Sequence, residues 1–308
     1  MKSSSTYNNM LNNWLKKPIN NLLTIGQARN WLTKNWPSGE TQPALISWLL
    51  AFIINRPLSH ITAYPKTILT IKQQHKLRQA LAKLNTGYPL AYITGQQDFY
   101  GRTFQTKPSA LIPRPESECL IDISKQLRQE FNQPTTWLDI GTGSGCLIIS
   151  IALELMNDDY FGGSDLSQSA LRLAKKNSAN LQTTINWQHG SLLHPWLKHN
   201  FGSAKQIFIL ANLPYLTPNE YHQRQIELSH EPKLALLGGV AGLELFKKLA
   251  LELPVFINKH PQQTIHLLTE SSLDQVTILQ NILSVSGLIW QKSFPDLTSR
   301  ARFNWWHN

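Results

Sequence analysis

The sequence has few of the residues that build cross-linked or metal-bound proteins. Only two of its 308 residues are cysteines, Cys119 and Cys146. Two cysteines supply neither a disulfide framework nor a cluster of metal ligands. The ten histidines are dispersed without the spacing of a metal site, so we expect no bound metal.

Long apolar runs are also missing. A membrane-spanning helix needs roughly 18 consecutive apolar residues, and the best run, Ile46 to Ile54, is far shorter and contains Ser47 and Trp48. Residues Met1 to Leu22 are rich in Asn, Lys and Ser and lack the apolar segment of a secretory signal. We therefore expect a soluble, cytoplasmic protein that does not enter a membrane.

Acidic residues are scarce, with 19 Asp and Glu against 29 Lys and Arg, which gives a formal charge of +10 and a pI near 9.6. Such a charge favours an anionic partner such as RNA, DNA or a ribonucleoprotein. A solvated basic surface on an ordinary enzyme is equally compatible. The basic residues are scattered, with adjacent pairs only at Lys16-Lys17, Lys175-Lys176 and Lys247-Lys248. Charge alone therefore does not decide between these alternatives.

The first ninety or so residues have helical patterns. Apolar residues recur at helical spacing after Thr24, a candidate N-cap. Further helices are predicted over Ala44 to Ile54 and over Gln73 to Leu84. The 42% hydrophobic content can build a packed core. We expect a small helical bundle without catalytic residues.

The pattern changes after Gly87. Short strands are predicted at Leu90 to Thr94, Phe99 to Phe104 and Ala110 to Ile112, followed by the stiff Pro113-Arg114-Pro115. We divide the chain into a helical domain (1–88), a β-hairpin linker (89–112) and a third part (113–308).

Strands and helices alternate in the third part, which predicts a doubly wound α/β domain with a mainly parallel sheet. Ile289 to Phe294 and Arg302 to Trp306 have no helix between them, so they are expected to form an antiparallel hairpin. The predicted strands are Thr136 to Ile140, Asp159 to Ser164, Ile185 to His189, Gln206 to Ala211 and Ile265 to Thr269, and the predicted helices are Cys146 to Leu155, Ser167 to Leu181, Gly242 to Leu251 and Leu273 to Ser286.

A glycine-rich loop follows the first of these strands and opens a helix. It consists of Gly141, Thr142, Gly143, Ser144 and Gly145. Its G-x-G-x-G spacing differs from the G-x-G-x-x-G that binds a pyrophosphate, so a nucleoside ligand without phosphates is favoured over a dinucleotide. Asp165 ends the second strand, where a carboxylate can accept hydrogen bonds from ribose hydroxyls. This combination predicts S-adenosylmethionine as the ligand, whereas the glycine loop alone would also be compatible with a structural turn.

A second motif, Asn212-Leu213-Pro214-Tyr215, follows the strand Gln206 to Ala211. The Asn212 side-chain carbonyl and the Leu213 main-chain carbonyl can accept both hydrogens of a planar NH₂ group and align its nitrogen with a methyl donor. Pro214 restrains Leu213, and the Tyr215 ring can pack on a planar acceptor. An ordinary turn is the common meaning of such a tetrapeptide, but the glycine loop upstream favours a site for nitrogen methylation.

Together the two motifs resemble the class I S-adenosylmethionine-dependent methyltransferases with an [N/D]-P-P-[Y/F/W] loop. Further stretches are similar to the protein-(glutamine-N5) methyltransferases, and to their HemK-type branch that modifies peptide chain release factors. These stretches are Tyr88 to Gly95 with Phe99 to Gly101, Leu111 to Glu118 against the signature I-P-R-P-[D/E]-[T/S]-E, His230 to Leu236, Gly238 to Leu243, and Asp296-Leu297 with Arg300 and Arg302.

The resemblance implies a Rossmann-like methyltransferase sheet with a helical N-terminal domain for substrate recognition. It implies that S-adenosylmethionine binds at residues 141–145, Asp165, Leu192 and Asn212, and that residues 212–215 bind and methylate the substrate. The implied substrate is the glutamine in the Gly-Gly-Gln loop of a release factor. We expect a monomer that works near the ribosome.

The sequence departs from the family pattern at several positions. Leu213 replaces the first proline of the acceptor loop, Ser191 and Leu192 replace an acidic and an aromatic residue near the adenine, and Ala241 replaces an acid. Three other functions remain open. They are glutamine methylation of a ribosomal protein, adenine N6 methylation of nucleic acid, which the positive charge favours slightly, and a binding protein without activity.

Overall fold

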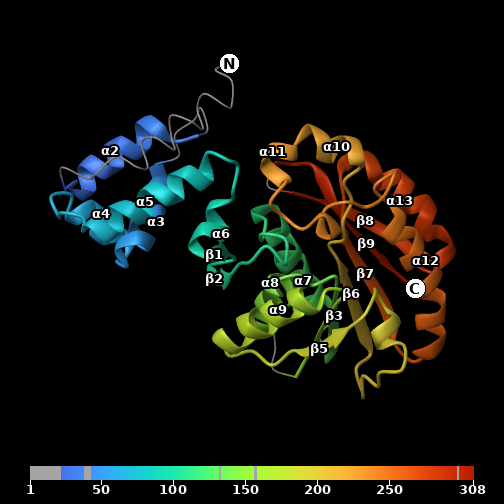
Figure 1. Cartoon of the computed structure of the whole chain (residues 1–308). Coiled ribbons are helices and arrows are strands. Elements are labelled where there is room, and N and C mark those ends of the chain that lie inside the picture. The colour runs from blue at the N-terminus through green and yellow to red at the C-terminus, as the bar shows by residue number, and fades with distance from the viewer. Residues whose placement is uncertain (1–21, 38–42, 132, 156–157, 297) are drawn as a thin grey trace. The chain divides into compact units, whose positions relative to one another are not determined.

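The chain divides into two compact units, Met1–Gly95 and Gln96–Asn308 (Figure 1). The computed structural model describes residues 22–37, 43–131, 133–155, 158–296 and 298–308. The prediction that residues before Leu22 contain no secretory signal concerns a segment outside these residues. Leu297 also lies outside them. Within the described ranges, no helix is both long enough and apolar enough to cross a membrane.

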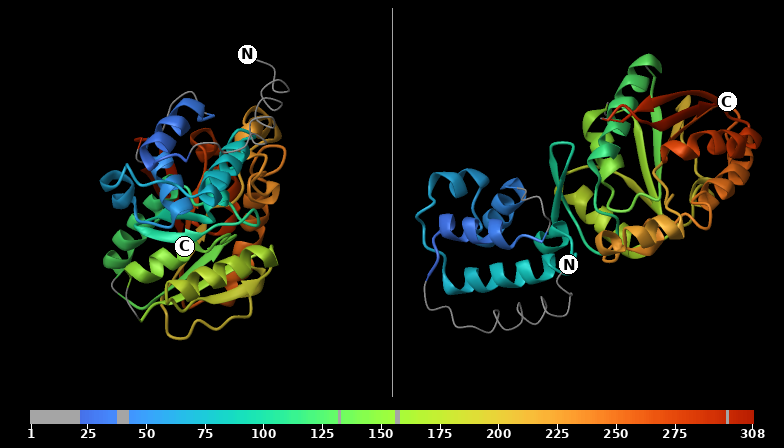
Figure 2. Two further views of the ribbon diagram at one scale, coloured as in Figure 1. Left: turned by 60° about the vertical axis from the view of Figure 1, so that its left-hand side comes forward. Right: turned by 90° about the horizontal axis from the view of Figure 1, so that it is seen from above.

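The first unit is helical, as the sequence predicts. Thr24 caps its first described helix through a capping box, since Thr24 Oγ1 accepts from the Gln27 amide at 3.2 Å and Gln27 Oε1 accepts from the Thr24 amide at 2.9 Å. The apolar sides of the helices meet in one core. Helix α5, drawn in cyan, lies beside the other helices of this unit (Figure 2). The helices are α2 (Ile25–Asn35), α3 (Pro43–Ile54), α4 (Leu58–Ala63), α5 (Ile71–Leu84) and α6 (Leu90–Thr94).

The strand predicted at Leu90 to Thr94 is wrong, because these residues form helix α6. Pro89 precedes the helix and Gly95 ends it in the left-handed conformation, with φ of 70°. Leu90 and Ile93 both pack on the helical core, at the i, i+3 spacing of a helix. The β-branched and aromatic residues suggested a strand, but the flanking Pro and Gly were the better signal.

Two other strand predictions near the boundary also need correction. Residues Phe99 to Phe104 are not one strand, because they include the turn of a hairpin formed by β1 (Gln96–Phe99) and β2 (Arg102–Gln105). Residues Ala110 to Ile112 form no strand, since Ala110 lies at a bend and Leu111 and Ile112 have no regular secondary structure. The Ile112 amide donates instead to Glu231 Oε2 at 3.0 Å.

The second unit contains a seven-stranded sheet in the order β5-β4-β3-β6-β7-β9-β8. The four pairings that join β5, β4, β3, β6 and β7 are all parallel, and β9 pairs antiparallel with both β7 and β8. This arrangement confirms the predicted fold class and the C-terminal hairpin. The strands are β3 (Thr135–Ile140), β4 (Tyr160–Asp165), β5 (Asn186–His189), β6 (Gln206–Ala211), β7 (Thr264–Glu270), β8 (Ile289–Pro295) and β9 (Ala301–His307).

Helices cover both faces of this sheet (Figure 1). One face packs α12 and α13 over alternate residues such as Leu138, Ile140 and Ile209. The other packs α7 and α8 over Trp137, Phe208 and their neighbours. The helices of this unit are α7 (Cys119–Phe131), α8 (Cys146–Glu154), α9 (Gln168–Asn180), α10 (Pro218–Gln223), α11 (Gln225–Leu228), α12 (Glu244–Lys259) and α13 (Val276–Leu283), with short 3-10 turns η1 (Pro115–Glu118), η2 (His194–Trp196), η3 (Lys233–Ala235), η4 (Leu273–Gln275) and η5 (Ser284–Ser286).

Two glycines in β4 make room for tryptophans on opposite faces of the sheet. A Cβ atom built on Gly162 would lie 2.7 Å from Trp196 Cη2, and one built on Gly163 would lie 2.4 Å from Trp187 Cζ3. Either contact is too close for a real Cβ. The indole rings therefore occupy the space that side chains from β4 would otherwise fill.

Helix α12 extends beyond its predicted end at Leu251. It continues through Pro254, an unfavourable residue in a helix interior, to Lys259. Leu253 and Phe256 are fully buried in the core on that side of the sheet. Their burial offsets the cost of the proline and explains why the helix does not stop.

A buried carboxylate anchors the start of β3, the strand that carries the glycine loop. The Asp159 side chain is inaccessible to solvent, and it forms an ion pair with Arg128 of α7, with 2.9 Å between Nε and Oδ2. It also accepts from the Thr135 amide at 2.9 Å and from Trp137 Nε1 at 3.1 Å. One side chain thus joins α7 to β3.

Replacing Asp159 with Ala should lower the free energy of unfolding of the second unit by about 3–5 kcal/mol, because Arg128 would remain buried without its partner. The adjacent Asp158→Ala is a matched control. The Asp158 side chain is 56% exposed and lies 3.5 Å from Arg128 Nη2, so its loss should cost less than about 1 kcal/mol. Urea denaturation followed by tryptophan fluorescence measures both values, and similar losses for the two variants would contradict this role of Asp159.

Candidate active site

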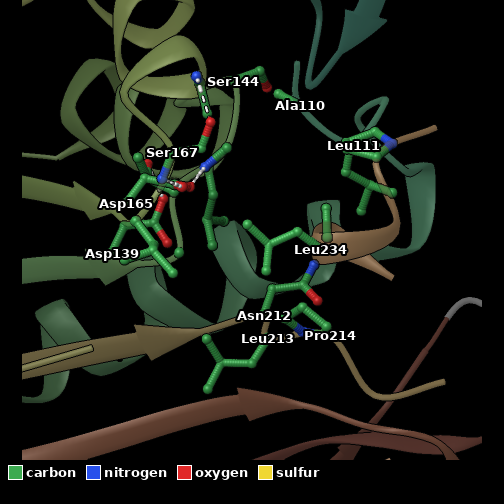
Figure 3. Close-up of a pocket in the computed structure, with 18 of the residues that line it drawn as sticks. Ala110, Leu111, Asp139, Ser144, Asp165, Ser167, Asn212, Leu213, Pro214 and Leu234 are labelled. Carbon is green, nitrogen blue, oxygen red and sulfur yellow. Dashed lines mark hydrogen bonds between the residues drawn. The ribbon is translucent and has the colours of Figure 1, made fainter. Parts of the chain in front are cut away.

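A pocket lies at the carboxyl ends of β3, β4 and β6 (Figure 3). In parallel α/β sheets this edge binds ligands, most often where the strand order reverses, as it does here between β3 and β6. The pocket has about 1190 Å³ of atom-free space, its open mouth included. All of its lining residues belong to the second unit.

The glycine loop forms one wall of the pocket, where Gly141, Thr142, Gly143 and Ser144 lie. Gly141, Gly143 and Gly145 all have positive φ, at 77°, 57° and 79°, a conformation that disfavours other residues. The amides of Gly141 and Thr142 both donate to the Ser164 carbonyl, at 2.8 and 2.9 Å. The loop is therefore tied to the end of β4.

Asp165, predicted to hold a ribose, lies at the end of β4 in the same wall. Its Oδ2 accepts from the Gly143 amide at 2.8 Å, and its Oδ1 accepts from the Ser167 amide at 2.7 Å. These bonds, drawn in Figure 3, fix the carboxylate. Each oxygen keeps a second lone pair for a ligand hydroxyl. Burial raises the pKa of Asp165, and the two amides partly counter that effect.

Asp139 is a pocket residue that the sequence reasoning did not single out. It lies near the end of the fully buried strand β3 and is 2% exposed. Its Oδ2 accepts from Thr142 Oγ1 at 2.6 Å. Burial, together with the nearby charge of Asp165, raises the pKa of Asp139 to about 7. An acidic residue inside an otherwise apolar strand was the signal that could have identified it.

Asn212, Leu213 and Pro214, which follow β6, form another part of the pocket wall (Figure 3). Leu213 is 2% exposed, and its Cδ2 lies 3.2 Å from the position of a Cβ on Gly141. The Leu213 side chain, where the family has proline, is thus accommodated in the core beneath the glycine loop.

Two glycines farther along the chain allow the backbone around the acceptor loop to pack closely. A Cβ on Gly238 would lie 2.4 Å from the Pro214 carbonyl oxygen, and one on Gly242 would lie 2.2 Å from that of Tyr215. Gln275 Nε2 donates to the same Tyr215 carbonyl at 3.0 Å. The segment Gly238 to Leu243, noted for its resemblance to the family, therefore supports the acceptor loop.

A chain of hydrogen bonds sets the orientation of the Asn212 amide. Ser117 Oγ donates to Glu270 Oε2 at 2.6 Å, and Asn212 Nδ2 donates to Ser117 Oγ at 2.9 Å. Since the carboxylate accepts the Ser117 proton, the Ser117 oxygen accepts from the NH₂ side of Asn212. Asn212 Oδ1 has no hydrogen bond to any described residue, which leaves it as an acceptor for a ligand.

Glu270, at the end of β7, is 2% exposed. Burial raises its pKa, while Ser117 and Arg302 favour the ionised form. Arg302 Nη2 lies 3.4 Å from Glu270 Oε1 and donates to the Tyr215 hydroxyl at 2.7 Å. Neither Ser117 nor Glu270 was a predicted site residue, because their relation to Asn212 depends on tertiary contacts.

The segment Leu111 to Glu118 is held in place by contacts from several of its residues. Arg114 forms an ion pair with Glu231, which also accepts from the Ile112 amide. Glu118 Oε1 accepts from the Tyr100 amide at 2.8 Å. This segment and residues 230–236, two stretches that resemble the family, thus meet beside the pocket, and Leu111 and Leu234 line it (Figure 3).

Most of the predicted site residues come together, but not all of them. Leu192 lines the pocket and adopts a positive φ of 47°. Gly145 and Tyr215 are not among the lining residues. Gly145 is the N-cap of α8, and the Tyr215 hydroxyl contacts Arg302 and Glu270. Burial, with the Glu270 charge, raises the pKa of Tyr215 to about 12, and stacking of its ring on a substrate stays a prediction.

The lining offers hydrogen-bond acceptors and negative charge. Its charged side chains are Asp139, Asp165 and Arg114, and Arg114 is already paired. Such a pocket suits a cationic ligand that carries hydroxyl groups, as S-adenosylmethionine does, and does not suit a pyrophosphate. In the described part of the chain, no group of three or more His, Cys, Asp or Glu is arranged to hold a metal ion.

Comparisons with known proteins agree along most of the chain. The PrmC N-terminal domain family matches residues 27–95. A release factor glutamine methyltransferase of Neisseria gonorrhoeae is 35% identical over 231 residues, which cover 75% of this chain and 80% of that protein. One from Coxiella burnetii is 28% identical over 284 residues, or 91% and 98% of the two chains. The crystal structure of a methyltransferase from Pyrococcus furiosus has a TM-score of 0.44 at 14% identity, covering 68% of this chain and 89% of that one.

The raised pKa of Asp139 predicts a pH effect on stability. A folded-state pKa of about 7 means that the folded protein retains a proton that the unfolded chain loses near pH 4. Folding is therefore favoured most below pH 4, and this contribution is lost as the pH rises to about 7. Asparagine does not titrate, so the Asp139→Asn variant should not lose this stability. Between about pH 4 and about pH 7, the free energy of unfolding of the variant should therefore rise relative to that of the wild type by up to about 4 kcal/mol. Urea denaturation at several pH values tests this, and parallel pH curves would contradict it.

Proposed function

Because this chain belongs to the family of release factor glutamine methyltransferases, we propose that it transfers a methyl group from S-adenosylmethionine to the side-chain nitrogen N5 of a glutamine in a release factor. We further propose that this glutamine is the one in the Gly-Gly-Gln loop. The substrate places the reaction in the cytoplasm, where translation occurs.

The orientation of Asn212 is the observation that carries the proposal. Its Nδ2 is engaged by Ser117, so Oδ1 is free to accept from a substrate NH₂ group. The Leu213 carbonyl follows directly in the chain and supplies a second acceptor. Two acceptors suit a neutral amide nitrogen, because such a group offers two hydrogens.

An amide nitrogen is a weak nucleophile because its lone pair is delocalised into the carbonyl group. Hydrogen bonds to Asn212 and Leu213 would hold both N–H groups and favour a pyramidal nitrogen, which localises the lone pair. When bound, S-adenosylmethionine supplies a methyl group on a positively charged sulfur. Asp165 would hold its ribose, and Asp139 and the loop Gly141 to Ser144 would surround the rest. After transfer the nitrogen can release its extra proton to water, so no catalytic base is needed.

Two other substrates share this chemistry. A glutamine of a ribosomal protein would fit the same acceptors, and so would the exocyclic amine of adenine. The positive charge of the chain does not support adenine as the substrate of this pocket, since residues 96–308 contain 18 basic and 18 acidic residues. The names of the relatives favour the release factor.

The first test is methyl transfer to a purified release factor. Incubation with S-adenosylmethionine, followed by mass spectrometry of the Gly-Gly-Gln peptide, should show one added methyl group on the glutamine. Asn212→Ala should reduce the rate at least about 100-fold, because an acceptor that orients the nitrogen is lost. An unmodified peptide, with cofactor binding confirmed by calorimetry, would direct the search to ribosomal proteins and then to nucleic acids containing adenine.

A second test addresses the positioning of Asn212. Ser117→Ala should lower kcat about 10- to 100-fold with little change in cofactor affinity, because the Asn212 amide can then rotate and misplace its acceptor. Ser117→Thr keeps the hydroxyl and should restore much of the rate. Ser124→Ala removes another fully buried serine hydroxyl, which bonds only within α7, and serves as the control. Equal losses in Ser117→Ala and Ser124→Ala would argue against the relay.

A further inference from the structure

The net charge of the chain resides in its first unit. Residues 1–95 contain 11 Lys and Arg but only one acidic residue, Glu40. Residues 96–308 contain 18 basic and 18 acidic residues and are neutral overall. Basic residues are scattered along the whole chain, whereas acidic residues are almost confined to the second unit. The excess of +10 is therefore a property of the helical unit alone.

In the described part of this unit, residues 22–37 and 43–95, there is no Asp or Glu to form an ion pair. The second unit, by contrast, pairs many of its basic side chains, as in Arg102–Glu154 and Lys247–Glu244. The eight basic residues of these first-unit ranges are Arg29, Lys34, Arg56, Lys66, Lys72, Lys76, Arg78 and Lys83.

Carboxylates are missing even where they would stabilise a helix. Two helices of the first unit, α2 and α5, begin with capping boxes in which Gln27 and Gln73 occupy the third position. Glutamate serves equally well there and also interacts favourably with the helix dipole. Helix α10 of the second unit uses Glu220 at the same position. The first unit thus lacks negative charge where it would benefit folding.

Three lysines form a stripe along α5. At 100° per residue, Lys72, Lys76 and Lys83 lie within about 40° of one another around the helix axis and span about 16 Å along it. All three are exposed. We call this group the lysine stripe.

Within the described part of the protein, few interactions stabilise the side chains of the lysine stripe. Lys72 and Lys76 are four residues apart, a spacing at which like charges repel. Lys83 lies over the Tyr88 ring, with 5.4 Å from Nζ to the ring centre. A bound polyanion would relieve the repulsion between these side chains.

We propose that the first unit binds the phosphate backbone of RNA through the lysine stripe. A surface whose charged groups are all positive fits a partner whose charged groups are all negative. A nucleic acid is such a partner, because it presents one negatively charged phosphate per nucleotide. Flexible, strongly hydrated lysines suit contacts that do not depend on base sequence. A basic stripe along a helix is the electrostatic signature of such binding.

A membrane surface and an acidic protein fit less well. A helix that lies on a membrane inserts its apolar face, but α5 uses its apolar residues, including Leu77, Leu81 and Leu84, in the core of the unit. Protein surfaces carry both charges, and protein–protein interfaces are depleted in lysine. The choice of RNA over DNA rests on the proposed function, because translation takes place among RNA molecules. The inference that the stripe binds phosphates does not depend on the proposed function.

The test measures binding of a short fluorescent single-stranded RNA to the full-length protein by anisotropy, without cofactor or release factor. Failure here is therefore independent of failure of methyl transfer. The wild type should bind with an affinity that falls steeply between about 50 and about 200 mM salt. Replacing Lys72, Lys76 and Lys83 together with Gln should weaken binding at least about tenfold and reduce the slope of log affinity against log salt by about 2.

The control replaces Lys247, Lys248 and Lys259 of α12 with Gln, which removes the same charge from the second unit. This variant should bind RNA like the wild type, and an equal loss in both triple variants would overturn the proposal. Tighter binding to duplex DNA than to RNA would also overturn it. So would equal competition by polyglutamate, which would indicate an acidic protein partner, or preferential binding to vesicles of phosphatidylglycerol.

A single substitution separates binding from folding. Gln73→Glu keeps the capping box of α5 and adds a carboxylate near the helix N-terminus, so it should raise the melting temperature slightly. The same carboxylate lies next to Lys72 and three residues from Lys76, and it should weaken RNA binding several-fold. A variant that is at least as stable as the wild type but binds RNA equally well would count against the lysine stripe.

Discussion

The hydrogen bond between Ser117 and the buried carboxylate of Glu270 joins parts of the chain that are far apart in sequence. Ser117 belongs to the segment before α7, Glu270 ends β7, and Asn212, which follows β6, donates to Ser117. Burial of Glu270 makes the bond costly to break, since an unpaired buried carboxylate is strongly unfavourable. The acceptor loop is therefore oriented by the sheet itself, and the ligand-facing oxygen of Asn212 is defined before any substrate binds.

The sequence predicted those features that depend on local patterns. The loop Gly141 to Gly145 needs positive φ and a strand before it, and both requirements are visible in the sequence. The capped helix after Thr24 and the C-terminal hairpin were correct for the same reason. The strand prediction for residues 90–94 was wrong because their side chains suggest a strand, whereas Pro89 and Gly95 favour one turn of helix. The prediction of one strand over residues 99–104 was wrong because a turn at Tyr100 and Gly101 divides the segment between two strands.

Residues that act through tertiary contacts were beyond local reasoning. Glu270 and Ser117 are recognisable only once β7 and η1 are known to approach Asn212, whereas Asp139 had a sequence signal, an acidic residue within a predicted buried strand, that the prediction did not use. The family resemblance located Leu111 to Glu118 and His230 to Leu236, but it gave no reason for them. The structure supplies one, since Arg114 and Ile112 share Glu231 as a partner.

The glycines of β4 have a consequence for how this sequence can change. Trp196 and Trp187 occupy the volumes next to Gly162 and Gly163 on opposite faces of the strand, and Trp187 also comes within 3.0 Å of where a Cβ on Gly145 would lie. Neither glycine can acquire a side chain until its indole has first been replaced by something smaller, and that first step leaves a cavity beside the glycine loop. Substitution at these positions is therefore ordered, and its intermediates are less stable than either endpoint. The strand beneath the pocket is held to its present sequence by packing, independently of any ligand.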